Sequence, residues 1–375
     1  MSESSETGGT APTGPAPRRS RSGWLDARVW LGVAVTLLFL WYALRDVHFV
    51  EVGRLIAGAD WVLLLGLSIP SYLGVSFLRA RRWAHFTAPI QEIATGPLFR
   101  AVSVGLTVNN ILPLRAGEVV RPWYLSRETG ASGTALLGTV VLERVVDTMT
   151  IILLAGVVIA LWGASSDGVL ARGAILLLPL ALLPAGFLVW LRARPEQVIG
   201  FAKRLLAFFP SRLTDLVERI LWQFHTGLGS LRGGAHLVWI GIDSLLIWFV
   251  GSAIPFIAAF WALDIDLGSP LETLVAAWAT LVAVAFAVAL PAAPGFFGIY
   301  HAAAKWALLR FGVSAKTAVA CGTLVHAVMW VTITVIGLVV LRSRRTSLRD
   351  LGQATRAAGS LPSAAEDPAQ RSAGE

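Results

Sequence analysis

Long apolar stretches limit what this chain can fold into more than any other feature. A hydrocarbon core of roughly 30 Å is crossed by about 20 apolar residues in a helix. The stretches of suitable length are Val29–Leu44, Trp61–Leu78, Thr134–Trp162, Gly173–Leu191, Ser244–Leu263, Thr273–Leu290 and Thr317–Leu341. Only 14% of the residues are charged, against about 25% in a typical soluble domain. With the shorter Gly295–Leu309, the sequence predicts an all-α polytopic membrane bundle of about eight transmembrane helices, with a broken or re-entrant hairpin in each half.

Basic residues are grouped beside these stretches. They lie in the N-terminal tail, after Leu191, after Leu341 and directly after Leu78, where the group is Arg79, Arg81 and Arg82. By the positive-inside rule all these regions face the cytoplasm. The formal net charge of +8 therefore reports topology, and it does not indicate a nucleic-acid partner. Two cytoplasmic ends require an even number of crossings, which favours a re-entrant hairpin over residues 97–124.

The ends of the chain and one connection differ in composition from the spans. Residues 1–22 and 346–375 hold too little apolar surface to fold alone, so we expect two disordered cytoplasmic tails. Residues 23–345 form the predicted transmembrane domain. Within residues 196–224, apolar side chains recur at helical spacing, which predicts short helices lying in the cytoplasmic interface.

Polar and ionisable residues interrupt the membrane domain at positions 109–121. Pro113 removes a backbone donor and disfavours a helix at the preceding residue, and Gly117 allows a turn or a close approach. Ionisable groups at membrane depth cost roughly 2.5–3.5 kcal/mol each on insertion scales, so we expect this segment to be buried in protein or to line a cavity. The candidate site residues are Asn109, Asn110, Pro113, Arg115, Gly117, Glu118 and Arg121.

A second broken segment follows the span that ends at Leu290. Prolines and glycines are concentrated in residues 291–298, and His301 and Lys305 follow at a spacing that places them on one helix face. Paired Gly/Pro-interrupted segments, one in each half, indicate the central site of a transporter; the alternative is that both are packing kinks. The candidate residues of this segment are Pro294, Gly295, Gly298 and His301.

Three charged residues lie inside a long apolar stretch: Glu143, Arg144 and Asp147. All three fit on one side of a helix, where Arg144 can pair with either carboxylate. The group is an internal ion pair or a cavity lining, and these interpretations are compatible. Together with the charges of residues 109–121 it is formally neutral, so a bound anionic headgroup would compete with the carboxylates for the arginines.

His326 and the single cysteine, Cys321, lie in the last apolar stretch. A lone buried histidine is more often a hydrogen-bonded core residue than a ligand, but His326 could reach His301 or the break at Pro294. One cysteine excludes an internal disulfide framework. The histidines and carboxylates lack the spacing of a known metal motif, so we expect no metal and no cofactor.

The motifs Asn109-Asn-Ile-Leu-Pro-Leu-Arg-Ala-Gly-Glu-Val-Val-Arg121, Glu143-Arg-Val-Val-Asp147 and Pro294-Gly-Phe-Phe-Gly298 occur in this order. Together they resemble the lysylphosphatidylglycerol synthase transmembrane family, which is related to the flippase domain of the multiple-peptide-resistance factor. The resemblance covers most of the membrane part. It implies an all-helical inner-membrane protein that moves lipids or polyprenyl-linked intermediates between leaflets, with the motif residues lining a cavity.

Two features depart from the family pattern. Many members carry a glutamate near the position of His301. The best-known relative also bears a soluble aminoacyl-transferase domain, whereas a mostly polar stretch follows Leu341 here. We therefore do not expect this chain to synthesise lysyl-phosphatidylglycerol.

The leading hypothesis is a lipid translocator that binds an anionic phospholipid or a polyprenyl-phosphate-linked lipid in a polar intramembrane cavity. Arg115 and Arg121 would contact the phosphate, and Glu118, Glu143 and Asp147 would hold those arginines when the site is empty. The lack of a P-loop motif argues against ATP-driven pumping by this chain alone. Membrane lipids are the expected partners.

Two alternatives remain from the sequence. One is a membrane enzyme acting on a lipid phosphate, with Glu118 or Asp147 as base and His301 as proton carrier. The other is a non-catalytic scaffold of an envelope-assembly complex.

Overall fold

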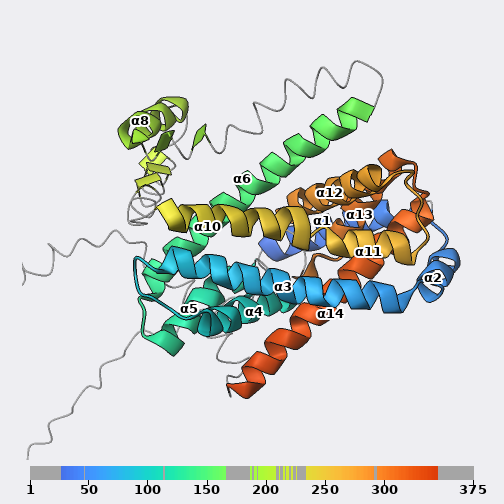
Figure 1. Ribbon diagram of the computed structural model, residues 1–375, viewed down its shortest axis with the longest axis horizontal. Coiled ribbons are helices and arrows are strands. Elements are labelled where there is room, and N and C mark those ends of the chain that lie inside the picture. The colour runs from blue at the N-terminus through green and yellow to red at the C-terminus, as the bar shows by residue number, and fades with distance from the viewer. Residues whose placement is uncertain are drawn as a thin grey trace, which may run out of the picture.

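The computed structural model describes residues 27–45, 47–112, 115–165, 234–290 and 294–344, together with parts of 186–225. Every regular element in these residues is helical, which confirms the predicted all-α class. The helices are α1 (Ala27–Leu44), α2 (Phe49–Ala57), α3 (Trp61–Thr87), α4 (Thr95–Ile111), α5 (Gly117–Thr129), α6 (Gly133–Ser165), α8 (Pro195–Leu205), α10 (Gly234–Leu245), α11 (Ile254–Ala262), α12 (Pro270–Ala287), α13 (Ile299–Leu308) and α14 (Ala315–Ser343). The other helical elements are the π-helical turn η2 (Leu246–Gly251) and the 3₁₀ turns η3 (Pro294–Phe296) and η4 (Leu309–Phe311). Figure 1 shows a bundle in which α4 packs against α3, α5 and α14.

Among the described residues, 5 helical runs are long and apolar enough to cross a membrane. They are α3, α6, α12, α14 and the continuous run Ala235–Ala262, which joins α10, η2 and α11. A shorter apolar helix, Ala34–Leu44, lies within α1. The chain is thus a multi-pass helical membrane protein. The expected span Gly173–Leu191 falls mostly outside the described residues, as do the two tails and much of the connection 196–224.

The helix α3 continues past the point where the sequence predicts its end. The sequence places Arg79, Arg81 and Arg82 in a loop after the second span, and the loop is wrong, because α3 is unbroken to Thr87. The helix continues because these arginines have protein partners. Arg82 is fully buried, the side chain of Arg79 is 13% exposed, and Arg81 forms an ion pair with Asp243 of α10. Two of these arginines therefore belong to the interior of the bundle.

The predicted interruption after the asparagines is confirmed, since α4 ends at Ile111 and α5 begins at Gly117. The two helices form a close hairpin at this point. An added Cβ on Gly117 would lie 1.8 Å from the carbonyl oxygen of Gly105, so the approach requires glycine. On its other face α4 meets α14, where Thr107 donates a hydrogen bond to the Ile333 carbonyl over 2.9 Å.

The run from α10 to α11 is interrupted by the π-helical turn η2. Wider π turns leave carbonyls to be satisfied from outside the helix, and neighbouring helices supply the donors. Ser71 of α3 donates to the Gly251 carbonyl over 2.5 Å, and Trp278 of α12 donates to the Phe249 carbonyl over 2.8 Å. The turn is thereby fixed between α3 and α12.

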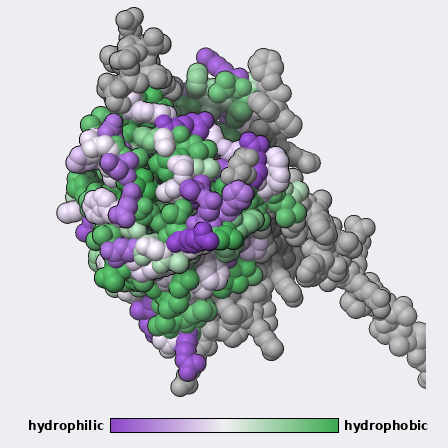
Figure 2. Space-filling model, turned by 90° about the vertical axis from the view of Figure 1, so that its right-hand side faces the viewer, coloured by the Kyte–Doolittle hydropathy of each residue, from purple (hydrophilic) through white to green (hydrophobic). Residues whose placement is uncertain are grey.

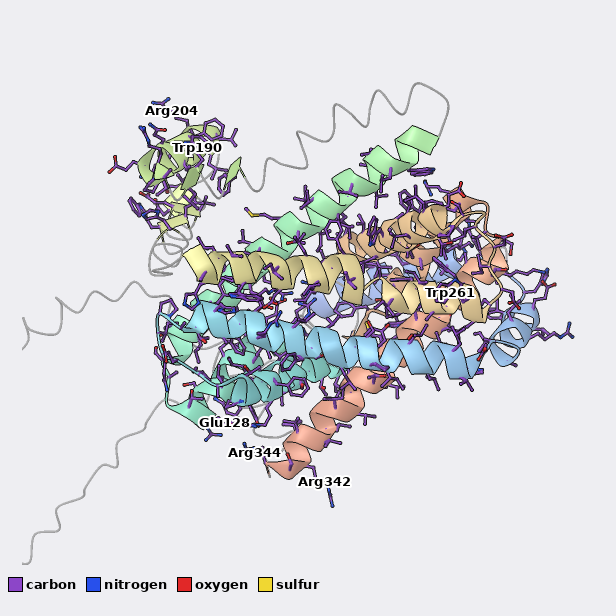
Figure 3. The ribbon with its side chains drawn as sticks, viewed as in Figure 1. Glu128, Trp190, Arg204, Trp261, Arg342 and Arg344 are labelled. Carbon is purple, nitrogen blue, oxygen red and sulfur yellow. The ribbon has the colours of Figure 1, made fainter. Side chains whose placement is uncertain are left out.

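Ion pairs connect helices at both ends of the bundle. Glu128 at the end of α5 accepts from Arg344, which follows α14, over 3.0 Å, and Figure 3 shows these residues together with Arg342 at one end while Trp261 lies toward the other. Near that other end, Lys316 of α14 pairs with Glu51 of α2 over 2.9 Å. Figure 2 views this end and shows hydrophilic side chains intermixed with hydrophobic ones.

Candidate functional site

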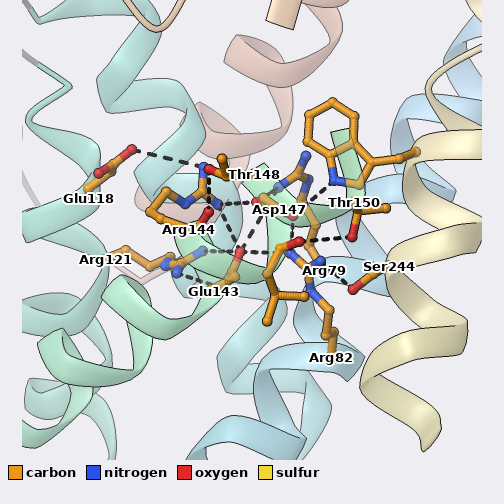
Figure 4. Close-up of polar contacts among 12 residues, drawn as sticks. Arg79, Arg82, Glu118, Arg121, Glu143, Arg144, Asp147, Thr148, Thr150 and Ser244 are labelled. Atoms are coloured by element: carbon orange, nitrogen blue, oxygen red, sulfur yellow. Dashed lines mark hydrogen bonds and ion pairs between the residues drawn. The ribbon is translucent and has the colours of Figure 1, made fainter. Parts of the chain in front are cut away.

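Charged side chains from three helices converge in the bundle interior (Figure 4). The helix α6 contributes Glu143, Arg144 and Asp147, whose positions within one helical turn put them on the same side. Arg79 and Arg82 come from α3, three residues apart, so they also share a face. Arg121 comes from α5. We call these six residues the ionic cluster: Arg79, Arg82, Arg121, Glu143, Arg144 and Asp147.

Glu143 is the carboxylate closest to α5. Its side chain is completely buried, and it accepts from Arg121 over 2.8 Å, from Arg144 over 3.0 Å and from Arg82 over 3.3 Å. Arg121 also lies over the ring of Trp83, with 4.2 Å between its Cζ and the ring centroid. Because three guanidinium groups share this carboxylate, Glu143 joins α3, α5 and α6.

Asp147 has the same function one helical turn further along α6. It pairs with Arg82 over 2.7 Å and with Arg144 over 2.8 Å, and Arg79 lies 3.4 Å away. Trp248 of η2 donates its indole N–H to this carboxylate over 2.9 Å. The predicted pairing of Arg144 with both carboxylates is therefore confirmed, and the carboxylates have additional partners that the sequence prediction did not include.

A small polar pocket adjoins the ionic cluster. It has a volume of about 30 Å³ and is lined by arginines, by Glu118 and Asn109, and by glycines and apolar residues of α4, α5 and α6. The arginines in its lining are Arg79, Arg121 and Arg144. The Nε groups of Arg121 and Arg144 are buried and have no hydrogen-bond partner among the described residues. We call this space the arginine pocket; the three guanidinium groups in its lining suit an anion.

The asparagines of the first break have different neighbours. Asn109 lines the arginine pocket, and its Oδ1 accepts from the backbone N–H of Gly117 over 2.8 Å. Asn110 instead faces α14, where its amide donates to Thr334 Oγ1 over 3.1 Å. The two asparagines thus lie on different sides of α4, and Pro113 lies outside the described residues.

Arg115 points away from the arginine pocket and toward the second break. Its Nη2 donates to the carbonyl oxygen of Val288 over 2.5 Å, and its Cζ lies 6.0 Å from the ring centroid of Phe296. It also lies 3.6 Å from Glu118. The two broken segments are therefore in contact, but Arg115 and Arg121 do not line one pocket as the sequence hypothesis requires.

The second break forms a separate cluster of aromatic rings and histidines. Pro294 begins the turn η3, and Gly295 and Gly298 have φ of 72° and 81°, values that favour glycine. His326 Nε2 lies 2.8 Å from the Gly295 carbonyl, and the His301 and His326 rings are 5.0 Å apart. In the described chain no hydrogen bond or ion pair joins this cluster to the ionic cluster.

Several partners of the cluster are absent from the sequence prediction. Arg79 and Arg82 carry a detectable signal, because a spacing of three directly after an apolar run allows the helix to continue with both on one face. Ser244, which accepts from Arg82 over 2.8 Å, and Trp248 are far away in sequence. Nothing local to them indicates these contacts.

A larger cavity lies elsewhere among the described residues. It has a volume of about 790 Å³ and is bounded by α1, α6, α12, α13 and η4. Its walls are alanines and aromatic or aliphatic side chains, with Arg310 as the one ionisable group besides Tyr42. We call it the apolar cavity. Its lining suits hydrocarbon rather than a polar ligand.

Comparisons with known proteins agree with this architecture. Residues 29–337 match the family model described as the lysylphosphatidylglycerol synthase transmembrane region. A protein named glycosyltransferase AglD, from Haloferax volcanii, is 27% identical over 62% of this chain and 41% of its own length. A UPF0104 membrane protein from Methanothermobacter thermautotrophicus is 25% identical over 66% of this chain and 75% of its own length. The chain thus spans about two fifths of the first relative, and no solved structure matches it.

Proposed function

Because the chain belongs to the lysylphosphatidylglycerol synthase transmembrane family, we propose that it binds the phosphate of an anionic lipid in the arginine pocket and moves that lipid between leaflets. The observation that carries the proposal is the convergence of Arg79, Arg121 and Arg144 on one pocket of a membrane bundle. Planar guanidinium groups bind phosphate through paired hydrogen bonds. Such groups at membrane depth are expensive unless they serve a ligand or pathway.

The assignment of phosphate contacts differs from the sequence hypothesis. Arg121 keeps its proposed role, because it lines the arginine pocket. Arg79 and Arg144 take the place of Arg115, which contacts the second break instead. Glu143 and Asp147 hold the pocket arginines in position, and Glu118, 31% exposed, lies at the rim beside Arg144.

Helix lengths support a re-entrant first hairpin within a bundle of about eight spans. At roughly 1.5 Å per residue, α4 is about 25 Å long and α5 about 20 Å, both shorter than a hydrocarbon core of roughly 30 Å. The hairpin then enters and leaves on one side, with both termini cytoplasmic in the inner membrane. The polar pocket at its tip would be reached from that side.

The hydrocarbon part of the lipid has a candidate location in the apolar cavity. The helix α6 lines both spaces, the arginine pocket with Arg144 and the apolar cavity with Ala155. These residues are about 16 Å apart along the helix axis. A lipid with long chains can therefore span the distance between the two spaces.

Transport follows from a rearrangement of the two broken segments. In the state described, Arg115 links them through the Val288 carbonyl. Breaking this link would open the tip of the α4–α5 hairpin and let the headgroup leave the pocket toward the other leaflet. The enzyme alternative has less support, because His301 lies with His326 and not with Glu118 or Asp147.

The test is a leaflet-asymmetry assay on the full chain in reconstituted vesicles with a labelled anionic phospholipid. We expect wild-type protein to accelerate its transfer and Arg144→Gln to reduce that acceleration. Arg342→Gln is the matched control, since it removes the same charge at an exposed position. Transfer no faster than in protein-free vesicles, across anionic headgroups, would overturn the proposal.

A further inference from the structure

The ionic cluster contains more positive than negative charge. Four arginines, Arg79, Arg82, Arg121 and Arg144, surround two carboxylates, Glu143 and Asp147. The cluster therefore has a surplus of two positive charges. All these side chains are at least partly buried, with exposures between 0% for Arg82 and 35% for Arg144.

Neighbouring charges in the described part of the chain do not remove this surplus. Glu118 at the rim lies 3.6 Å from Arg115 and 4.0 Å from Arg144, so Glu118 and Arg115 are counted together with the cluster. Asp243, the next buried carboxylate along α10, is paired with Arg81. With Arg115 and Glu118 included, five arginines face three carboxylates, so the surplus among the described residues is still two positive charges.

Proton exchange cannot remove the surplus either. A guanidinium does not lose its proton in proteins, and the two carboxylates contribute at most one negative charge each. A lysine or histidine cluster could neutralise itself by deprotonation, but an arginine cluster cannot. Because buried uncompensated charge is costly, the surplus among the described residues favours the binding of an anion in the pocket.

The anion would bind at the arginine pocket, whose volume of about 30 Å³ in the state described is close to that of one water molecule, so a phosphate group must widen it. Arg79, Arg121 and Arg144 line the arginine pocket, and the buried Nε groups of the last two lack partners. Arg121 is 8% exposed on its side chain and Arg82, behind it, also has a buried Nε without a partner. The charge surplus therefore lies at the pocket, and the Nε groups without partners belong to arginines of the same cluster.

We propose that the ligand is a lipid whose headgroup carries two negative charges, that is, one that ends in a phosphate monoester, in preference to a singly charged phosphodiester. This inference rests on the proposed function, because it assigns the headgroup class of the same pocket. A terminal phosphate has a second ionisation with a pKa of about 6 and carries both charges above that pH. A phosphodiester has one charge and would leave one arginine uncompensated.

The experiment compares two lipids that differ by one methyl group. Phosphatidic acid has a terminal phosphate, and phosphatidylmethanol has the same chains with that phosphate methylated, which removes the second ionisation. Binding to the full chain in nanodiscs is measured at pH 8 and pH 5. At pH 8 we expect phosphatidic acid to bind at least about tenfold more tightly than phosphatidylmethanol. At pH 5 this preference should disappear, because the terminal phosphate then holds one charge and the arginines keep theirs.

Two variants test the charge count. Arg79→Gln lowers the surplus by one at a residue whose ion pairs, 3.4 and 3.9 Å, are the longest in the cluster, so we expect the preference at pH 8 to shrink toward equality. Arg342→Gln, an exposed control, should keep it. A second arm with a polyprenyl monophosphate distinguishes the glycerolipid from the polyprenyl source, and a preference for either terminal phosphate supports the inference.

The possible outcomes separate this inference from the proposed function. Equal binding of phosphatidic acid and phosphatidylmethanol at pH 8 would overturn the two-charge headgroup while leaving anionic lipid binding in place. A full preference retained by Arg79→Gln would overturn the charge count in the same way. Binding of neither lipid, nor of the polyprenyl monophosphate, by correctly folded protein would overturn both.

Discussion

The guanidinium of Arg115 donates a hydrogen bond to the carbonyl oxygen of Val288 over 2.5 Å, so two segments that the sequence marks as broken hold each other. The ring of Phe296 lies under the same guanidinium. The backbone φ is 60° at Phe296 and 52° at Arg115. Left-handed backbone at non-glycine residues costs of order 1–3 kcal/mol. The junction therefore stores backbone strain that its contacts must offset, and any opening of the hairpin tip must break it.

We expect Arg115→Gln to accelerate lipid transfer, because the junction opposes the rearrangement. A hydrogen bond to a charged group contributes about 1.5–3 kcal/mol, so the rate should rise about tenfold or more. Lipid retained by purified protein should stay near the wild-type amount, since Arg115 does not line the arginine pocket. The measurement combines the vesicle transfer assay with mass spectrometry of retained lipid. Slower transfer than wild type would show that the junction is needed for the transport step.

Glu143→Gln should destabilise the fold strongly. This substitution leaves Arg82, Arg121 and Arg144 without their shared carboxylate, and breaking a buried ion pair costs about 3–5 kcal/mol. Glu118→Gln is the matched control at the partly exposed rim, where the cost is about 0–1 kcal/mol. Thermal or denaturant unfolding in detergent measures both. Similar unfolding midpoints for the two variants would be inconsistent with a structural role for Glu143.

Gly117→Ala should prevent correct packing of the α4–α5 hairpin. The new Cβ would lie 1.8 Å from the Gly105 carbonyl oxygen and 2.7 Å from Asn109 Oδ1, and overpacking costs about 1–3 kcal/mol or more. Gly138→Ala on α6 meets nothing within 4 Å and should be neutral or stabilise by up to about 1 kcal/mol. Yield of monodisperse protein and its unfolding midpoint report the difference; a Gly117→Ala protein as stable as wild type would rule out the close approach.

Ala283→Phe should reduce the lipid that copurifies with the protein, because the ring would fill part of the apolar cavity. Ala235→Phe makes the same change at an exposed position of α10 and should leave lipid retention unchanged. Native mass spectrometry of both variants measures the bound lipid. Equal retention would indicate that the hydrocarbon chains lie outside this cavity.

The sequence predicts helices well here because long apolar runs leave few other structures in a membrane. The start of α6 at Gly133 and its end at Ser165 lie within a few residues of the predicted Thr134–Trp162. The end of α3 could not be placed in this way, since hydropathy treats Arg82 as a flanking charge. Its burial depends on Glu143 and Asp147, which only the folded chain brings to it.

The candidate site could be predicted only where its residues are close in the sequence. Charges close in sequence, such as Arg144 and Asp147, reveal their pairing through helical spacing. The direction in which Arg115 points depends on the Val288 carbonyl, more than 170 positions away. Local pattern therefore indicates the first break as a candidate site without showing which arginine faces the pocket.

The π-helical turn η2 changes the direction in which side chains point on either side of it in the run Ala235–Ala262. A π turn holds about one residue more than an α turn, and one residue corresponds to about 100° of rotation. Residues of α10 and of α11 therefore do not keep the common face that a constant period would assign to them. Removing a single residue between Leu246 and Gly251 would leave the apolar composition of the run almost unchanged, yet it would turn the indole of Trp248 away from Asp147. In comparisons with relatives, a one-residue gap in this stretch is therefore a change of geometry in the ionic cluster rather than a neutral difference in length.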